Sequence, residues 1–128
     1  MVLVDTSAWI RALSGIAPFR AHLDHLLSRD EVVGHDLVYG ELLMGDSGGR
    51  RGLLDLYRRF DCATTARHDD VVMLVRMRSL QARGIGWVDA HLLASALVDG
   101  HPLWTADMPL ATVADELGVR HRIDSKES

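Results

Sequence analysis

Four acidic residues stand beside apolar sequence or at the end of an expected strand: Asp5, Glu41, Asp89 and Asp107. A carboxylate in such surroundings costs free energy unless something compensates its charge. Oxygen ligands that come from distant parts of a chain suit a hard divalent cation such as Mg²⁺ or Mn²⁺. The pattern therefore predicts a metal-dependent enzyme that acts on phosphate groups.

Each acid also has an ordinary structural explanation. Aspartate is favoured at helix amino ends, so Asp89 and Asp107 could be helix caps. Glu41 lies on an apolar helix face, where a buried salt bridge to an arginine is the alternative. Asp5 is harder to explain as a cap, because the two hydroxyl residues that follow it can already cap a helix. The metal and capping interpretations remain open at this point.

The bulk composition indicates one globular domain over residues 1–128, with a flexible polar tail at 124–128. The chain has 48% hydrophobic and 25% charged residues, a balance that fits a single core. Its one cysteine, Cys62, cannot form an internal disulfide and is expected to be buried as a small apolar residue. No apolar run approaches the roughly 18 residues of a membrane span, and no signal-like segment opens the chain. A soluble cytoplasmic protein is expected.

The net charge of −4 argues at first against a nucleic-acid ligand. However, the four acids named above equal this deficit, because −4 plus 4 is zero, and bound cations would cancel their field. Thirteen of the fourteen basic residues are arginine, which binds phosphate bidentately. An RNA or DNA ligand is therefore not excluded.

Strands and helices alternate along the chain. Apolar runs predict strands at 2–5, 31–34, 101–105 and 119–123. Helical periodicity predicts helices at 6–13, 18–29, 36–44, 52–60, 66–83, 88–98 and 109–117. Such alternation favours a parallel sheet covered by helices on both faces. Ligands bind such sheets beyond the carboxyl ends of the strands, where Asp5 and Asp107 are expected.

Four segments carry a family resemblance: VLVDTSAWI, VYGELLMG, WVDAHLLASALVDG and LWTADMPLATVADELGV. Together they resemble the PIN-domain ribonucleases, and among these the VapC toxins of toxin-antitoxin pairs. The resemblance runs from Val2 to about Ile123. It implies an α/β fold, a PIN-like three-layer sandwich with a central, mostly parallel sheet flanked by helices. One departure is that Met108 follows Asp107, where the family commonly has an aromatic residue.

The resemblance also implies an activity and a site. The activity is metal-dependent endoribonuclease cleavage, with one or two Mg²⁺ or Mn²⁺ ions per site. The catalytic and metal-binding residues would be Asp5, Glu41, Asp89 and Asp107. The hydroxyl residues that bind metal-linked water or substrate phosphate would be Thr6, Ser7 and Thr105.

RNA would be held by arginines along the phosphate path. The candidates are Arg11, which follows the first expected strand, and the group Arg50, Arg51, Arg58, Arg59 and Arg67. A solvated helix face is the plain alternative for each. Trp9 and Trp87 are candidates for base stacking, although tryptophan is more often part of a core. The implied partners are a transfer or ribosomal RNA substrate, a VapB-type antitoxin that blocks the acidic groove, and a second copy of the chain in a homodimer.

Two other functions compete with this one. A PIN-like domain without activity would only bind partners, and such a domain would be expected to lose at least one of the four acids. An aspartyl-phosphate enzyme or receiver-like switch would also place an aspartate at a strand end. It would normally add a lysine that faces the site, whereas the sole lysine, Lys126, lies in the tail.

Overall fold

The structure is a computed structural model that describes residues 1–46, 49 and 51–123. Its three strands are β1 (Val2–Val4), β2 (Val32–Val33) and β3 (Leu103–Trp104). Its helices are α1 (Thr6–Leu13), α2 (Phe19–Ser28), α3 (Asp36–Met44), α4 (Arg51–Tyr57), α5 (His68–Arg78), the short 3₁₀ helix η1 (Leu80–Ala82), α6 (Trp87–Asp99) and α7 (Met108–Glu116). No helix of the described residues is long and apolar enough to cross a membrane.

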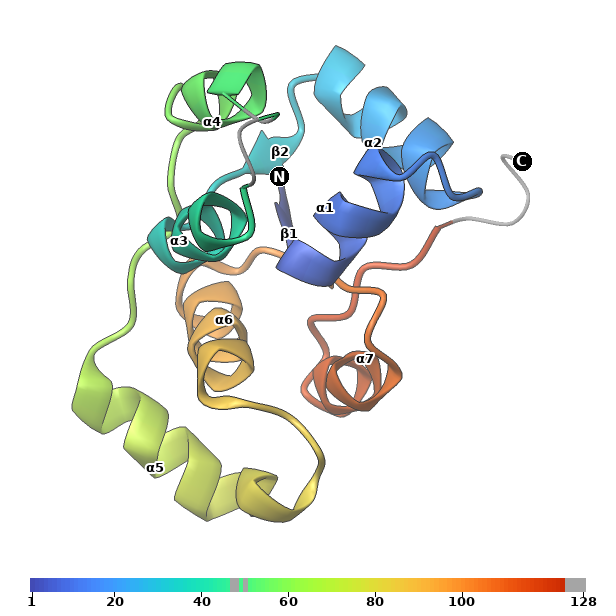
Figure 1. Ribbon diagram of the computed structural model, residues 1–128. Coiled ribbons are helices and arrows are strands. Elements are labelled where there is room, and N and C mark those ends of the chain that lie inside the picture. The colour runs from blue at the N-terminus through green and yellow to red at the C-terminus, as the bar shows by residue number, and fades with distance from the viewer. Residues whose placement is uncertain (47–48, 50, 124–128) are drawn as a thin grey trace.

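The sheet is parallel throughout, with the strand order β2-β1-β3. All seven strand residues are buried, as expected for a sheet covered on both faces. Figure 1 shows α1 and α2 on one side of the strands and α3 and α6 on the other. The predicted α/β sandwich is therefore confirmed, although its strands are only two or three residues long.

The core forms where α1, α3 and α6 pack against the sheet. Trp9 of α1 is 1% exposed and meets Tyr57 edge-on and Phe60 at a tilt. Leu92 and Leu93 of α6 are fully buried, as the apolar run of this helix predicted. This packing fixes the amino ends of α1 and α6 relative to the sheet.

Three expectations about the fold are wrong. The helix predicted at 66–83 is interrupted, because Ser79 takes a left-handed conformation (φ 53°) between α5 and η1. The strand predicted at 119–123 is reduced to one parallel bridge, between Leu103 and Arg120. Cys62 is exposed instead of buried, and its backbone forms a parallel bridge with Gly34, just beyond the edge strand β2.

A histidine pair joins α2 to the last segment of the described chain. The Nε2 atoms of His22 and His121 lie 2.8 Å apart, so one ring donates to the other and the pair shares a proton. The His22 ring also packs edge-on against Trp104. Burial, followed by the neighbouring His22, lowers the pKa of His121 from 6.5 to about 4.

The lowered pKa of His121 predicts that the folded protein loses stability in mild acid. The unfolded chain takes up a proton at His121 near pH 6.5, whereas the folded chain does so only near pH 4. Folding stability contributed by this residue is therefore complete above pH 6.5 and falls as the pH drops toward 4, by ~1 kcal/mol once partial solvent exposure is allowed for. His121→Gln should reduce the fall in melting temperature between pH 7 and pH 4, and the exposed-site control His68→Gln should not. An equal fall in melting temperature between pH 7 and pH 4 for His121→Gln and the wild type would contradict this role of His121.

Candidate active site

Asp5 lies at the carboxyl end of the central strand. Its backbone N–H donates to the carbonyl of Trp104 (2.8 Å), which continues the pairing of β1 with β3. The residue is 4% exposed and is the only buried carboxylate among the described residues. Its side chain does not cap α1, although it occupies the N-cap position. The prediction that Asp5 stands at a strand end is confirmed.

Two hydroxyl groups hold the Asp5 carboxylate in place. Ser7 Oγ and Thr105 Oγ1 each donate to Oδ2 of Asp5, both at 2.7 Å. The two hydroxyl oxygens lie 3.1 Å apart. These contacts fix the orientation of the Asp5 carboxylate. They also join the start of α1 to the end of β3.

The same hydroxyls connect Asp5 to the segment that carries Asp107. The backbone N–H of Asp107 donates to Thr105 Oγ1 (3.0 Å), and that of Ala106 donates to Ser7 Oγ (3.0 Å). Asp107 is half-buried at the N-cap position of α7, but its side chain makes no cap hydrogen bond. The capping explanation therefore does not account for Asp107.

Glu41 enters from α3. It is exposed, and its Oε1 accepts a hydrogen bond from Thr6 Oγ1 at 2.6 Å. The alternative of a buried salt bridge is wrong, because none of the ion pairs among the described residues includes Glu41. Thr6 thus links the first turn of α1 to an acid 35 positions along the chain.

Asp89 faces the other acids from the first turn of α6. Its Oδ2 accepts the backbone N–H of Gly86 (3.0 Å), so the capping explanation holds in part for this residue. Burial raises the pKa of Asp89, and the charges of Asp5, Asp107 and Glu41 raise it further, against the hydrogen bond from Gly86. Asp89 is therefore close enough to the other three acids to be repelled by their charge.

The cluster of these four acids, called the acidic cluster below, has the chemistry of a cation site. Within the described residues, no arginine, lysine or histidine forms an ion pair with any of them. Their oxygen donors are the ligands that Mg²⁺ and Mn²⁺ prefer. As the side chains stand, however, no three histidine, cysteine, aspartate or glutamate residues of the described chain are placed to hold one ion. The oxygen atoms and the uncompensated charge of the acidic cluster fit a divalent cation. The four acidic side chains would have to move closer together to coordinate one ion.

Three helices begin at the acidic cluster. Asp5 precedes α1, Asp107 precedes α7, and Asp89 lies in the first turn of α6. The amino end of a helix carries partial positive charge and unpaired N–H groups, which favour carboxylates and phosphate oxygens. The fold therefore offsets part of the repulsion within the cluster and also suits an anionic ligand beside it.

Not all of the predicted RNA-binding arginines lie among the residues that the structure describes. Arg11 is exposed in the last turn of α1, and its guanidinium lies 5.7 Å from the ring centre of Phe19. Arg51 is exposed at the first residue of α4, and no hydrogen bond or ion pair described for the chain joins it to the acidic cluster. Arg50 lies outside the described residues.

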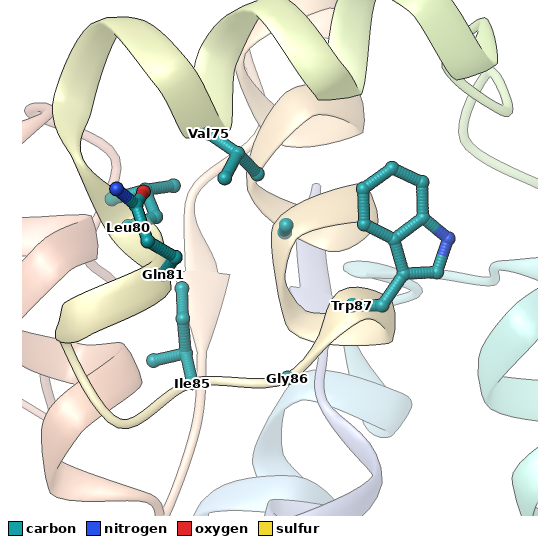
Figure 2. Close-up of a pocket in the computed structure, with 7 residues that line it drawn as sticks. Val75, Leu80, Gln81, Ile85, Gly86 and Trp87 are labelled. Carbon is teal, nitrogen blue, oxygen red and sulfur yellow. The ribbon is translucent and has the colours of Figure 1, made fainter.

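The two tryptophans proposed for base stacking differ. Trp9 is buried in the core and cannot stack on a base, whereas Trp87 is 46% exposed. Figure 2 shows Trp87 on one side of a cavity of about 170 Å³, with Leu80 and Gln81 on the other. Gly86, whose N–H binds Asp89, also lines this cavity. An apolar hollow therefore adjoins the acidic cluster.

The chain belongs to the PIN domain family, whose model matches residues 2–116. Within that family it is a member of the VapC group. It is 44% identical over 120 residues to "Ribonuclease VapC32" of Mycobacterium tuberculosis, with the same values in two strains, and the match covers 93% of this chain and 94% of the relative.

A solved structure supports the fold. The crystal structure of PAE2754 from Pyrobaculum aerophilum superposes with a TM-score of 0.57 over 93% of this chain and 90% of that chain. Only 20% of the aligned residues are identical, so this likeness bears on the fold alone. The family predicted from the sequence segments is confirmed.

Proposed function

We propose that this protein is a metal-dependent endoribonuclease toxin that hydrolyses RNA phosphodiester bonds at the acidic cluster. The observation that carries the proposal is the buried Asp5 carboxylate, held by Ser7 and Thr105 among acids that no basic side chain of the described residues neutralises. Membership of the VapC group and the likeness to a protein named as a ribonuclease give independent support.

Asp5, Asp89 and Asp107 are the residues that would hold Mg²⁺ or Mn²⁺, with Glu41 at the edge of the site. A bound divalent ion would stabilise charge on the phosphoryl oxygens and acidify water at neutral pH. Ser7 and Thr105 would keep the Asp5 carboxylate oriented for this role.

The remaining groups position the substrate and move a proton. Glu41 is exposed and oriented by Thr6, so its carboxylate can accept the proton of the attacking water. The amino ends of α1 and α7 direct N–H groups and partial positive charge toward the phosphate. No side chain of the cluster has to act as a nucleophile, because water supplies the attacking oxygen.

The chemistry of the RNA ends tests this proposal. Purified protein should cut RNA in Mg²⁺ and leave no 2′,3′-cyclic phosphate, because water rather than the ribose 2′-hydroxyl attacks the phosphorus. Cyclic-phosphate ends would show that the 2′-hydroxyl is the nucleophile and would overturn the mechanism. Uncut RNA in the presence of Mg²⁺ and of Mn²⁺ would overturn the function.

Thr105→Val should reduce kcat by roughly tenfold to a hundredfold, the usual effect of losing a group that orients a metal-binding side chain. Valine has the shape of threonine but lacks the hydroxyl that donates to Asp5 and accepts from the Asp107 backbone, so both acids lose a positioning contact. The matched control is Thr112→Val, whose hydroxyl donates to the Met108 carbonyl on the exposed face of α7. Similar kcat values for both variants would exclude the positioning role of Thr105.

The other predicted properties remain part of the proposal. A VapB-type antitoxin would neutralise the toxin, with a basic side chain in place of a metal as counter-charge to the acidic cluster. A transfer or ribosomal RNA substrate, a homodimer and a cytoplasmic location are expected from the resemblance. The rival of an inactive binding module is disfavoured by the presence of all four acids. The rival of a receiver-like switch is disfavoured by the PIN family match.

A further inference from the structure

A second, larger hollow lies next to Thr105, on the side of the site away from α5. Its volume is about 630 Å³, within the usual range for sites that hold a small ligand. Thr105 and Ala106 line it together with the segment from Arg120 to Ile123. Because Thr105 lines the hollow and its Oγ1 lies 2.7 Å from the Asp5 carboxylate, the hollow adjoins the acidic cluster.

The wall of this hollow combines arginines with apolar side chains. Arg120 and Arg122 line it together with Phe19 and Met108. Phe19 stacks on the buried Trp104 ring at 5.5 Å between ring centres, which fixes the apolar floor. A charged and apolar wall of this kind complements a nucleotide, which has an anionic phosphate and a flat, weakly polar base.

The arginines are available to an anionic ligand. Arg120 forms no ion pair with any described residue. Arg122 pairs with Asp115 at 3.0 Å, but both side chains are more than half exposed, so exchange of this partner for a phosphate costs little. Arg11 adds a third cation, which lies over Phe19 at the margin of the hollow.

The ring of His121, which lies between Arg120 and Arg122 in the sequence, contributes no positive charge to the wall of the hollow. Burial and the neighbouring His22 lower the pKa of His121 to about 4, so the His121 ring is neutral near pH 7. It therefore offers a surface and a hydrogen-bonding nitrogen, and the positive charge of the wall comes from the arginines.

We propose that this hollow binds the RNA nucleotide adjacent to the scissile phosphate, with Arg120 and Arg122 on its phosphate and Phe19 and Met108 against its sugar and base. The assignment rests on the proposed function. It moves the RNA path from the predicted Arg50 and Arg51 to the C-terminal segment of the described chain. There, Arg120 and Arg122 line the same hollow as Thr105, whose hydroxyl donates to the Asp5 carboxylate of the acidic cluster.

Binding of a short, mixed-sequence, fluorescently labelled single-stranded RNA tests the assignment. The protein carries Asp5→Asn so that it does not cut the probe, and anisotropy is measured over a range of KCl concentrations. Arg120→Met should weaken binding roughly tenfold and reduce the slope of log K against log[salt] by about 0.7, the effect of one lost single-strand phosphate contact. Arg120→Lys should restore the slope, because it restores the charge.

The matched control is Arg76→Met. Arg76 is an exposed arginine in the last turn of α5, a helix that Figure 1 places far from the C-terminal segment. This variant should bind the probe as its parent does. Melting curves of Arg120→Met check the fold, which is expected to persist because Arg120 meets Leu103 through its backbone.

In the cleavage-competent protein, Arg120→Met should raise KM about tenfold and leave kcat within about twofold. Equal RNA affinity and salt slope for Arg120→Met and Arg76→Met would overturn the assignment. An Arg120→Met variant that loses affinity for a protein partner and not for RNA would also overturn the assignment. The hollow would then be an antitoxin-binding site. If the wild type leaves RNA intact in Mg²⁺ and Mn²⁺, the proposed function itself has failed. If it cuts RNA while Arg120→Met behaves like the control, only the nucleotide site has failed.

Discussion

Asp5→Asn will reduce RNA cleavage by at least about a thousandfold, equivalent to ~4 kcal/mol of transition-state stabilisation. The substitution keeps the size of the side chain but removes its charge. It also places an amide where Ser7 and Thr105 both donate to Oδ2. A buried, fixed carboxylate at the end of the central strand cannot be replaced by a neighbour, because Glu41 is held separately by Thr6.

The fold should survive this change. The charge of Asp5 helps to raise the pKa of Asp89, so loss of the Asp5 charge also relieves the repulsion between these two residues. We expect unchanged circular dichroism and a melting temperature no lower than that of the wild type in EDTA. Asp55→Asn, an exposed aspartate of α4, is the matched control and should cut RNA at the wild-type rate. Cleavage by folded Asp5→Asn at more than a few per cent of the wild-type rate would refute the role of Asp5.

Removal of divalent cations will have a comparably large effect. EDTA should abolish cleavage, and added Mg²⁺ or Mn²⁺ should restore it, because the four acids have no other counter-charge among the described residues. The ion should also stabilise the fold, by about 2.7 kcal/mol at a hundred times its Kd. Mn²⁺ should therefore raise the melting temperature of the wild type clearly and that of Asp89→Asn much less.

The pH dependence of metal binding follows from Asp89. Burial and the neighbouring carboxylates raise the pKa of this acid, so a proton competes with the cation at a higher pH than at an ordinary aspartate. The Mn²⁺-induced rise in melting temperature should thus shrink as the pH falls toward that raised pKa. Full cleavage in EDTA, or a Mn²⁺ shift of equal size in the wild type and Asp89→Asn, would show that the acidic cluster is not a metal site.

Much of this site could be predicted from the sequence because its acids break strong local patterns. Asp5 ends an apolar strand, and the structure places it at the carboxyl end of β1. Glu41 interrupts an apolar helix, and its lack of an ion pair excludes the structural alternative. Asp107 is the one acid whose sequence departs from the family pattern, because Met108 follows it where the family commonly has an aromatic residue. The hydrogen bond of its backbone N–H to Thr105 supplies a positioning contact.

Other features depend on tertiary structure and left no local pattern. Neither glycine nor proline marks Ser79, so the break between α5 and η1 was hidden in a continuous helical period. The hollow beside Thr105 forms only when the C-terminal segment pairs with β3 through Arg120. Arg120 and Arg122 were therefore missed, while the denser arginine cluster around 50–59 attracted the RNA prediction.

The central claim is that the acidic cluster built round Asp5 cuts RNA. Its most direct test is to map RNA ends by sequencing, after parallel expression of the wild type and of Asp5→Asn at equal protein levels. We expect new ends at discrete positions with the wild type and none of them with Asp5→Asn. The same new ends with both proteins would contradict the central claim, since cleavage would then not depend on this carboxylate.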